Sequence, residues 1–301
     1  MSTSAPPITS SSANLRGAGW MTLGMLGYVV NDAFIKLAAE EIPLFEAIFL
    51  RGLVITMVLV LLTRSRGEFH SLREHLNRPL GLRVATETLA TVLYLLALTK
   101  LPIAGITAVL QIVPVAVTFA AARLLRERVS LARVGAVLVG FIGVLLVVKP
   151  GTDDFSPWYI AGFLAVFVIV VRELATTRIP SSVPSLVVAL GTAVAITTMG
   201  GVVSLGQGWE RPDISVLGLL VGASAFLTLG YVASVVTVRT GDLSFSAPFR
   251  YTVLVFAIVL QIVVFGDVPD ALTFVGTAII GAAGLWAFWR EQVITAPIRR
   301  G

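Results

Sequence analysis

Three polar residues in an otherwise apolar segment form the pattern in this chain that is best suited to chemistry. Glu87, Thr91 and Tyr94 are spaced so that a helix would carry all three on one face. An ionisable group inside a long apolar segment is costly, and it marks a binding site or an ion pathway. We therefore predict that Glu87 binds an ammonium group or a proton. The alternative is that Glu87 only pairs with Arg83, four residues earlier on the same helix.

A second apolar segment repeats this polar face. Ser224, Thr228 and Tyr231 have the same spacing, with Ser in place of Glu. Gln111, three residues before Pro114, is a further polar group in an apolar segment. Because proline removes a backbone hydrogen bond, the freed carbonyl could bind substrate, although a kink alone is enough to explain the proline. We predict that both faces and Gln111 contribute to one substrate-binding cavity.

The residue types that enzymes need are scarce. The chain has no cysteine and two histidines, His70 and His75, whose spacing of five suits neither a helical metal pair nor a buried general base. The chain contains no Gly-x-Gly-x-x-Gly motif and no phosphate-binding loop. The sequence therefore predicts no catalytic residue, no metal site and no cofactor, and a protein that is not an enzyme.

The elements that would position these polar groups are membrane helices. Of the 301 residues, 56% are hydrophobic and only 13% are charged, and the mean hydropathy is +0.93. A soluble domain carries about 25% charged residues. The composition thus predicts an all-α integral membrane protein in the lipid bilayer. Its net charge of +5 comes from basic residues that border apolar segments, a pattern that reports topology and not nucleic-acid binding.

Ten apolar segments are long enough to cross a bilayer, which takes roughly 20 residues per helix. Prolines fall at most of their boundaries, for example Pro43, Pro102 and Pro184. We predict helices at residues 17–37, 43–63, 79–98, 103–123, 130–148, 157–177, 184–204, 212–238, 245–265 and 269–289.

A glycine-spaced motif occurs twice in the chain. Its two copies are Gly135, Gly140 and Gly143, and then Gly276, Gly281 and Gly284, at one offset of 141 residues, the difference between 276 and 135. The same offset aligns Asn31-Asp32, with the two valines before it, onto Arg172-Glu173. Two matches at one offset indicate an internal duplication. Small residues at this spacing also let helices approach closely in lipid.

The charges at the segment ends predict the topology. One set of ends carries most of the arginines, including Arg64, Arg78, Arg123, Arg178, Arg239 and Arg290. Basic ends face the cytoplasm, so both termini are predicted to be cytoplasmic. Because each half has an odd number of helices, five, the halves must have opposite orientations. We predict a cytoplasmic tail at 1–15, a first repeat at 16–150, a second, inverted repeat at 151–290 and a second tail at 291–301.

Charged residues near the two ends of the spans are candidate gates. Asp32 and Arg51 lie at similar depth in one half, and Glu173 and Arg250 lie at similar depth in the other. A transporter needs two gates that are not open together, and an ion pair at each end can serve. In the alternative, Asp32 pairs with Lys36 on its own helix, and Arg172 and Arg250 reach lipid head groups.

Several of these features resemble a known family. Pro114 in the fourth segment, the Arg126-Glu127-Arg128 reversal and the glycine-spaced fifth segment, within two inverted halves, look like the EamA-type drug/metabolite transporters. The resemblance covers residues 16–290, and in size and loop pattern it is strongest to the ten-helix aromatic amino-acid exporters. The second half departs from the pattern, with Pro248 at the start of its fourth segment and Gly266-Asp267 where Gly-Glu is usual.

The resemblance implies a secondary transporter that exports small organic solutes, above all amino acids including aromatic ones, by alternating access around a midplane cavity. Efflux of cationic drugs or other metabolites is one alternative. A membrane enzyme or sensor that transports nothing is another. The expected location is the cell inner membrane, and the expected partners are a small-molecule substrate and the bilayer, without an obligate protein partner. Ion coupling stays open at this stage.

Overall fold

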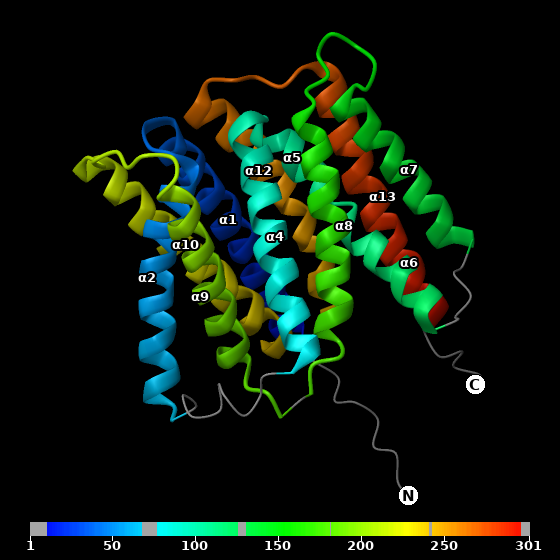
Figure 1. The fold of residues 1–301 in the computed structure, drawn as a ribbon. Coiled ribbons are helices and arrows are strands. Elements are labelled where there is room, and N and C mark those ends of the chain that lie inside the picture. The colour runs from blue at the N-terminus through cyan, green and yellow to red at the C-terminus, as the bar shows by residue number, and fades with distance from the viewer. Residues whose placement is uncertain (1–10, 68–76, 126–130, 181, 241–242, 296–301) are drawn as a thin grey trace, which may run out of the picture.

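The computed structural model describes residues 11–67, 77–125, 131–180, 182–240 and 243–295, and within these ranges all regular secondary structure is helical (Figure 1). The helices are α1 Ser11–Glu41, α2 Leu44–Ser65, α4 Arg78–Lys100, α5 Ile103–Leu110, α6 Val113–Leu125, α7 Leu131–Val148, α8 Trp158–Thr176, α9 Ser185–Ser204, α10 Ile214–Thr240, α11 Leu243–Ser246, the 3-10 helix η2 Ala247–Tyr251, α12 Thr252–Phe265 and α13 Ala271–Thr295. The all-α prediction is confirmed for these residues.

Most of these helices have the length and composition of membrane spans. Within the described residues, seven segments qualify, at Leu44–Ser65, Arg78–Lys100, Ile103–Leu124, Trp158–Thr176, Ser185–Ser204, Ile214–Thr237 and Ala247–Phe265. Two shorter apolar segments, Val134–Val148 and Ala271–Ala287, lie in α7 and α13. The chain is therefore a multi-pass membrane protein. The count of ten spans, which also needs α1, stays a prediction.

The helix boundaries follow from local chemistry. Asn77 caps α4, its side-chain oxygen accepting a hydrogen bond from the N–H of Leu80 at 2.8 Å. Prolines occupy the N-cap positions of α2, α5, α8 and α9, as Pro43, Pro102, Pro157 and Pro184. The helix α1 begins at Ser11, inside the stretch predicted as a tail. The Arg126-Glu127-Arg128 reversal and both histidines fall outside the described residues.

The fourth predicted helix is two helices, α5 and α6. At the junction the N–H of Gln111 donates to the carbonyl of Ala108 at 3.2 Å, and Ile112 donates to Val109 at 3.1 Å. Bonds to the third preceding residue tighten the turn, and Pro114 has no N–H with which to restore the α-helical pattern. A full interruption thus replaces the simple kink that the sequence allowed.

The corresponding segment of the second half is also irregular. The helix predicted at 245–265 consists of α11, the 3-10 helix η2 with Pro248 in its first turn, and α12. The residue 141 positions after Gln111 is Thr252, where α12 begins. Both halves therefore change helical geometry at matching positions. Discontinuous helices at matching positions of two repeats commonly border the binding site of a transporter.

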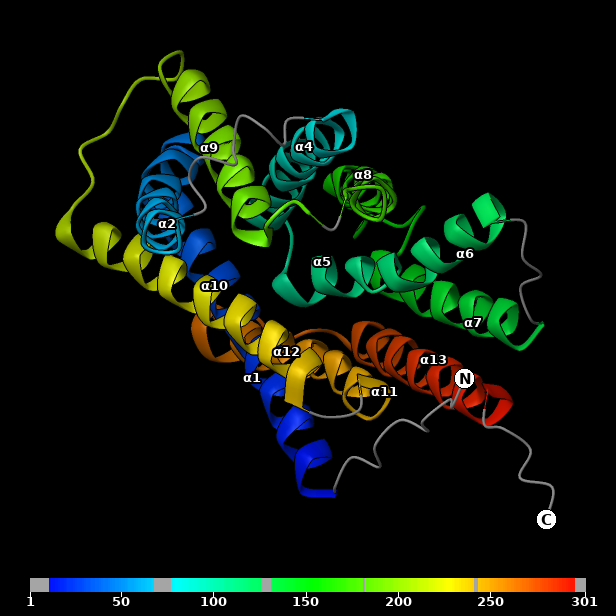
Figure 2. The same ribbon diagram turned by 90° about the horizontal axis from the view of Figure 1, so that it is seen from below.

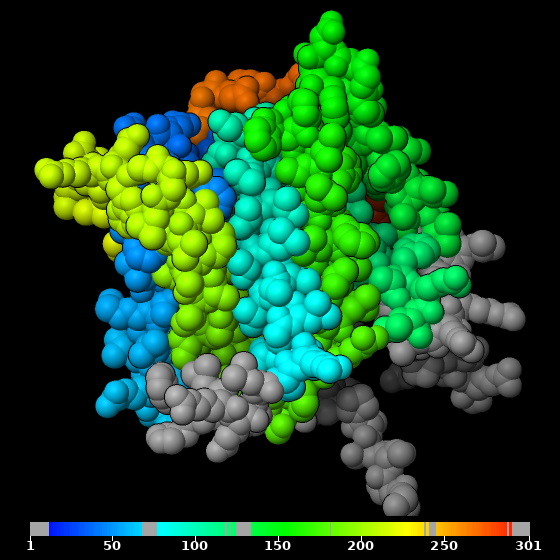
Figure 3. All heavy atoms as spheres, in the orientation of Figure 1, coloured from blue at the N-terminus to red at the C-terminus, as the bar shows by residue number. Residues whose placement is uncertain are grey.

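Four helix pairs hold the bundle together: α1 with α10, α4 with α8, α2 with α9 and α7 with α13 (Figure 2). In the predicted duplication α1 corresponds to α8, and α4 corresponds to α10. Exchanging the two halves therefore converts the α1–α10 pair into the α8–α4 pair. The α2–α9 and α7–α13 pairs each join corresponding helices and stay unchanged. This pairing is the one that a two-fold related duplication requires. The inverted repeat itself stays a prediction. Helices α9, α4 and α8 lie side by side on one face of the molecule (Figure 3).

Glycine permits the closest of these contacts. A Cβ atom on Gly143 would lie 2.7 Å from the carbonyl oxygen of Gly276, and a Cβ on Gly276 would lie 2.5 Å from that of Gly143. The backbones of α7 and α13 therefore touch at the predicted glycine motif. Gly27 of α1 is similar, since a Cβ there would lie 2.8 Å from the carbonyl of Phe226 on α10. Close approach of this kind is how membrane helices gain packing energy without a hydrophobic driving force.

The two ends of the bundle differ in charge, as the sequence indicates. The start of α1, the end of α2 and the end of α13 lie at one end (Figure 1), together with Arg64, Arg78 and Arg239. We name this the inner end, after its predicted cytoplasmic location. The opposite end, the outer end, carries Lys149 and Asp270 in the turns beside α7 and α13.

Candidate functional site

Two polar clusters lie inside the bundle, and the first is toward the outer end. The outer cluster consists of Asn31 and Asp32 on α1, Arg51 on α2 and Tyr94 on α4. The Tyr94 hydroxyl donates to Asp32 Oδ2 at 2.5 Å, and Asn31 Nδ2 donates to Asp32 Oδ1 at 3.0 Å. Arg51 Nη1 donates to Asn31 Oδ1 at 3.1 Å. Three helices are thus tied together by one hydrogen-bonded network.

The acid of the outer cluster is held by neutral donors and not by a cation. Arg51 reaches Asn31 rather than Asp32, and its Nε is buried without a hydrogen-bond partner in the described structure. Lys36 is bound elsewhere, donating to the carbonyls of Leu98 at 2.8 Å and Leu101 at 2.5 Å. A cation at the last carbonyls of a helix is favourable. The Asp32–Lys36 pair considered from the sequence is therefore not formed.

The second cluster lies toward the inner end and contains more charge. The inner cluster consists of Arg83 and Glu87 on α4, Arg172 and Glu173 on α8, and Thr192 on α9. Arg172 Nη1 bridges both carboxylate oxygens of Glu87, at 2.9 and 3.0 Å, and Arg172 Nη2 donates to Glu173. Arg83 lies 3.6 Å from Glu87 and donates to Thr192 at 2.9 Å.

These contacts change the interpretation of Glu87. The pair with Arg83 exists, yet the closer partner is Arg172 on another helix. The sequence pointed to Arg172, because it aligns with Asn31 at the repeat offset, but it did not pair Arg172 with Glu87. Glu173 takes part as the acceptor of Arg172, and no contact in the described residues joins it to Arg250, which is exposed in η2. A Glu173–Arg250 gate would require another conformation and stays a prediction.

Burial differs between the clusters. In the outer cluster, Asn31 and Arg51 are 4% and 6% exposed. In the inner cluster, the side chains of Glu87, Arg172 and Glu173 are 14%, 23% and 39% exposed. Asn31 and Arg51 are therefore more deeply buried than the charged groups of the inner cluster, while Asp32 and Tyr94 keep an intermediate exposure.

Tyrosines lie near both clusters. Tyr231 of α10 is 59% exposed and lies within electrostatic reach of Glu87 and Arg172. Its ring packs edge-on against Tyr28 of α1, with 5.9 Å between the ring centroids. Glu87 and Tyr94 are seven residues apart on α4, about 10 Å along a helix. The helix α4 therefore contributes a residue to each cluster, and Tyr231 lies beside the inner cluster as Tyr94 lies within the outer one.

The other predicted binding residues differ in whether their polar groups already have hydrogen-bond partners. The hydroxyl of Ser224 donates to the carbonyl of Leu220 at 2.9 Å, and that of Thr228 donates to the carbonyl of Ser224 at 2.8 Å. Both hydroxyls are thus satisfied within α10. Gln111, at the α5–α6 interruption, has a side-chain nitrogen that is buried without a hydrogen-bond partner in the described structure. Thr91 is partly buried on α4, between Glu87 and Tyr94.

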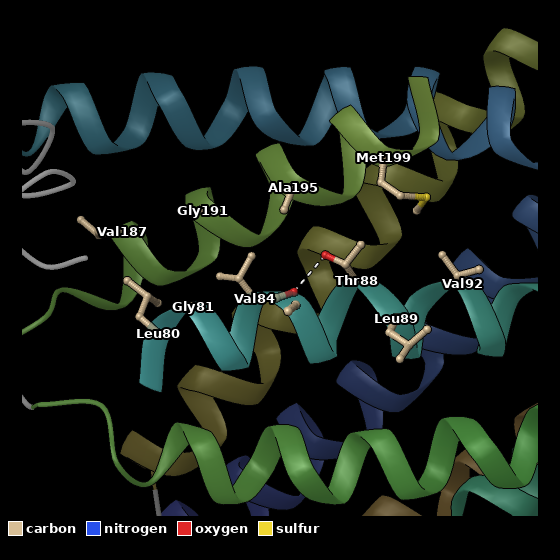
Figure 4. A pocket seen from close by; sticks show the side chains of 11 residues that line it. Leu80, Gly81, Val84, Thr88, Leu89, Val92, Val187, Gly191, Ala195 and Met199 are labelled. Atoms are coloured by element: carbon tan, nitrogen blue, oxygen red, sulfur yellow. Dashed lines mark hydrogen bonds between the residues drawn. The ribbon is translucent and has the colours of Figure 1, made fainter. Parts of the chain in front are cut away.

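A separate groove runs between α4 and α9 (Figure 4). Its volume is about 580 Å³, and Leu80 and Val187 lie at one end with Val92 and Met199 at the other. All 11 lining residues are uncharged, and the hydroxyl of Thr88 is occupied by the carbonyl of Val84 at 2.9 Å. The groove suits hydrocarbon, so we place the polar site at the two clusters. Within the described residues, no group of three or more His, Cys, Asp or Glu side chains could hold a metal ion.

Comparisons with known proteins agree with a transport function. Residues 15–149 match the EamA-like transporter family. The chain is 26% identical to an S-adenosylmethionine uptake transporter of Rickettsia felis over 92% of this chain and 94% of that protein. It is 28% identical to a riboflavin transporter of Vibrio cholerae (88% and 90% covered), and 27% identical to a pseudopaline exporter of Pseudomonas aeruginosa (87% and 92% covered).

A solved crystal structure has the same fold. It superposes on this chain with a TM-score of 0.63 at 20% sequence identity, covering 96% of this chain and 100% of the other. At this identity the likeness concerns the fold alone.

Proposed function

We propose that this small-molecule transporter is of the EamA-type drug/metabolite transporter superfamily and exports zwitterionic metabolites by alternating access. One observation carries the proposal: a single helix, α4, contributes an acid to the inner cluster and a tyrosine to the outer cluster, seven residues apart. A substrate bound between the clusters would contact Glu87, Thr91, Tyr94 and Tyr231. Gates at the two ends would then open in turn.

The substrate class that fits best has an α-amino-acid group and a flat ring. Glu87 offers a carboxylate for an ammonium group, and Arg172 offers a guanidinium for a carboxylate. Tyr231 offers an exposed ring for stacking on a planar group. Aromatic amino acids have this chemistry, in line with the exporters that the sequence resembles. S-adenosylmethionine, which the Rickettsia felis relative is named for, also joins an amino-acid group to a flat base.

A second candidate is a flat metabolite without an amino-acid group. The riboflavin transporter of Vibrio cholerae supports it, at 28% identity over most of both chains. Such a substrate would depend on Tyr231 and Tyr28, whose rings pack edge-on, and little on Glu87. The two candidates therefore differ in how much the carboxylate matters.

Counterflow of labelled solutes into liposomes that contain only this protein tests both candidates. The panel consists of labelled phenylalanine, S-adenosylmethionine and riboflavin, each competed by unlabelled solute. We expect saturable counterflow of the first two. Folded wild-type protein that moves none of the panel, nor any other small metabolite in competition, contradicts the transport proposal.

Glu87→Gln separates the two substrate classes. It keeps the shape of the side chain and removes the charge that pairs with an ammonium group, so amino-acid transport should fall while riboflavin transport, if present, should not. Thr88→Val is the matched control, since Thr88 is the next residue and its hydroxyl is bound within α4 beside the apolar groove. Unchanged kinetics of Glu87→Gln for every solute would limit Glu87 to a structural role.

A further inference from the structure

The apolar groove between α4 and α9 lies where two of the tight helix pairs meet. Helix α4 packs against α8, and α9 packs against α2. One wall of the groove runs from Leu80 to Val92 on α4, and the other runs from Val187 to Met199 on α9 (Figure 4). The groove therefore follows the seam between the α4–α8 pair and the α2–α9 pair.

The groove faces hydrocarbon in a bilayer. Both α4 and α9 have the length and composition of membrane spans. Gly81, Ala85 and Leu89 are four residues apart, so they share one face of α4, and all three line the groove and are exposed. Because an exposed apolar face within a membrane span contacts lipid, the groove is open to acyl chains from the side.

The length of the groove matches one leaflet. Leu80 and Val92 lie at its two ends and are twelve residues apart on α4, about 18 Å along a helix. One leaflet contributes about 15 Å, half of a hydrocarbon core of about 30 Å. Leu80 is close to the inner end, since α4 begins at Arg78. One extended acyl chain from the inner leaflet therefore spans the whole groove.

The inner end of the groove carries positive charge. Arg78 is exposed at the start of α4, and Arg178 is exposed just after the end of α8, the helix that packs against α4. The segments 77–82 and 177–187 contain no Asp or Glu. Arginines beside an apolar groove at the membrane surface suit a lipid whose head group is an anionic phosphate.

The corresponding place in the other half is filled by protein. Gly222 lies 141 positions after Gly81, and a Cβ atom on Gly222 would lie 2.6 Å from the ring of Phe34 on α1. The residue 141 positions after Phe34 is Ala175 on α8, which has no ring to offer. A Cβ atom on Gly81 accordingly has nothing within 4 Å. The start of α4 thus keeps a space that the equivalent part of α10 lacks.

We propose that this groove binds one anionic phospholipid of the inner leaflet, with an acyl chain between α4 and α9 and the phosphate against Arg78 and Arg178. The chain fills the gap along the seam, and the phosphate accepts charge-assisted hydrogen bonds from the arginines. The lipid binds the folded protein and therefore stabilises it. The site lies outside the proposed substrate site, so lipid binding does not depend on the transport function.

A leucine in place of a groove glycine tests the acyl-chain site. A Cβ atom on Gly191 meets only Val84, at 3.9 Å, so Gly191→Leu extends into the groove without displacing the backbone. Native mass spectrometry of delipidated protein given phosphatidylglycerol should show one retained lipid per wild-type chain and at least tenfold less in Gly191→Leu. Gly218→Leu on α10 is the matched control, because a Cβ atom there has nothing within 4 Å and Gly218 lies outside the groove. Gly81→Leu, on the other wall, replaces Gly191→Leu where that variant does not fold.

The head-group site is tested with Arg78→Gln and three probes. Wild-type protein should retain phosphatidylglycerol in preference to phosphatidylcholine, and Arg78→Gln should reduce this preference. Phosphatidylglycerol should raise the midpoint of thermal unfolding of the wild type and of Gly218→Leu, and leave that of Gly191→Leu unchanged. Inorganic phosphate alone should not raise it, since it has no acyl chain for the groove.

Several results overturn the lipid site. Retention of phosphatidylglycerol that is equal in wild type and Gly191→Leu does so, as does equal retention of the two lipids by the wild type or stabilisation by phosphate alone. Displacement of the lipid by phenylalanine or riboflavin assigns the groove to the substrate instead. A dimer that only Gly191→Leu dissociates assigns it to a second copy of the chain. None of these measurements needs transport, so a failure of counterflow overturns the transport function alone.

Discussion

The outer and inner clusters use similar residues at two depths of one bundle, and they differ in how charge is paired. The outer cluster buries an arginine and an asparagine and leaves its acid, Asp32, to neutral donors. The inner cluster keeps its arginines partly exposed and surrounds Glu87 with two of them. A polar group inside a membrane can thus be stabilised either by hydrogen bonds from neutral donors or by pairing with cations.

The two solutions suit two tasks. Pairing with Arg172 and Arg83 keeps Glu87 ionised, and the two arginines can turn from Glu87 toward a ligand. In the outer cluster, Asp32 is bound by Tyr94 and Asn31, and no cation in the described structure contacts it. We therefore expect a substrate at the inner cluster and a gate at the outer cluster.

Removing Arg172 tests the neutralisation of the inner cluster and should have the largest effect. Arg172→Gln leaves Glu87 and Glu173 without their closest cation, and truncating one partner of a buried charge pair costs about 2–5 kcal/mol. Since Arg172 is 23% exposed, we expect the low end of this range, about 2 kcal/mol or roughly a 30-fold loss of counterflow. Arg172→Lys, the matched control, keeps the charge and should recover part of the activity. Full activity in Arg172→Gln would remove the inner cluster from the mechanism.

Removing the hydroxyl of Tyr94 or Tyr231 should have the next largest effect and should distinguish the two clusters. Tyr94 donates to a carboxylate, a bond of about 1.5–3 kcal/mol, whereas Tyr231 is 59% exposed. Tyr94→Phe should lower counterflow at pH 7 by about tenfold at the low end of that range, and Tyr231→Phe by less than about twofold. Tyr231→Ala should impair bulky substrates more than small ones. Equal losses in the two Phe variants would contradict the assigned difference.

A charge exchange tests whether the inner cluster rearranges. If Glu173 leaves Arg172 and pairs with Arg250 when the inner end closes, each single charge reversal should lower transport. Because Glu173 is 39% exposed, the pair is worth no more than about 1 kcal/mol, or roughly fivefold in rate. Glu173→Arg combined with Arg250→Glu should then transport better than either single change. Equal loss in all three proteins would leave Glu173 with Arg172 throughout.

Removing the exposed ion pair at the outer end should have the smallest effect, and this effect is on stability. Lys149 lies between Asp270 and Asp154. Its hydrogen bond to Asp270 lowers the pKa of Asp270 and raises the pKa of Lys149. Lys149→Met should reduce the free energy of unfolding by less than about 1 kcal/mol, measured by thermal unfolding in detergent. A larger loss would show that this turn holds the bundle closed.

The pH dependence of that pair has a definite sign. The lowered pKa of Asp270 means that its contribution is complete above the ordinary value of 3.8 and is lost as the pH falls through the lowered pKa. The raised pKa of Lys149 means that its contribution is complete below 10.5 and is lost as the pH rises through the raised pKa. Between pH 5 and 9 we therefore expect the difference between wild type and Lys149→Met to stay constant.

Helix positions were largely predictable from the sequence because they depend on local properties. Runs of apolar residues, prolines at N-caps and clustered arginines identify a span wherever its neighbours lie. The predicted helix at 184–204, for example, is α9 at Ser185–Ser204. The interruption at Gln111–Ile112 was not predictable, since Pro114 is equally consistent with a kink.

Residue type and hydropathy alone are enough to locate Asp32, Glu87 and Arg172 within apolar helices. Their partners, in contrast, follow only from the way the helices pack. Whether Glu87 meets Arg83 on α4 or Arg172 on α8 depends on how the two helices are rotated and how closely they pack, which no local pattern encodes. The same holds for Tyr94 and Asp32, which are 62 residues apart in the chain and are joined by the packing of α1 against α4.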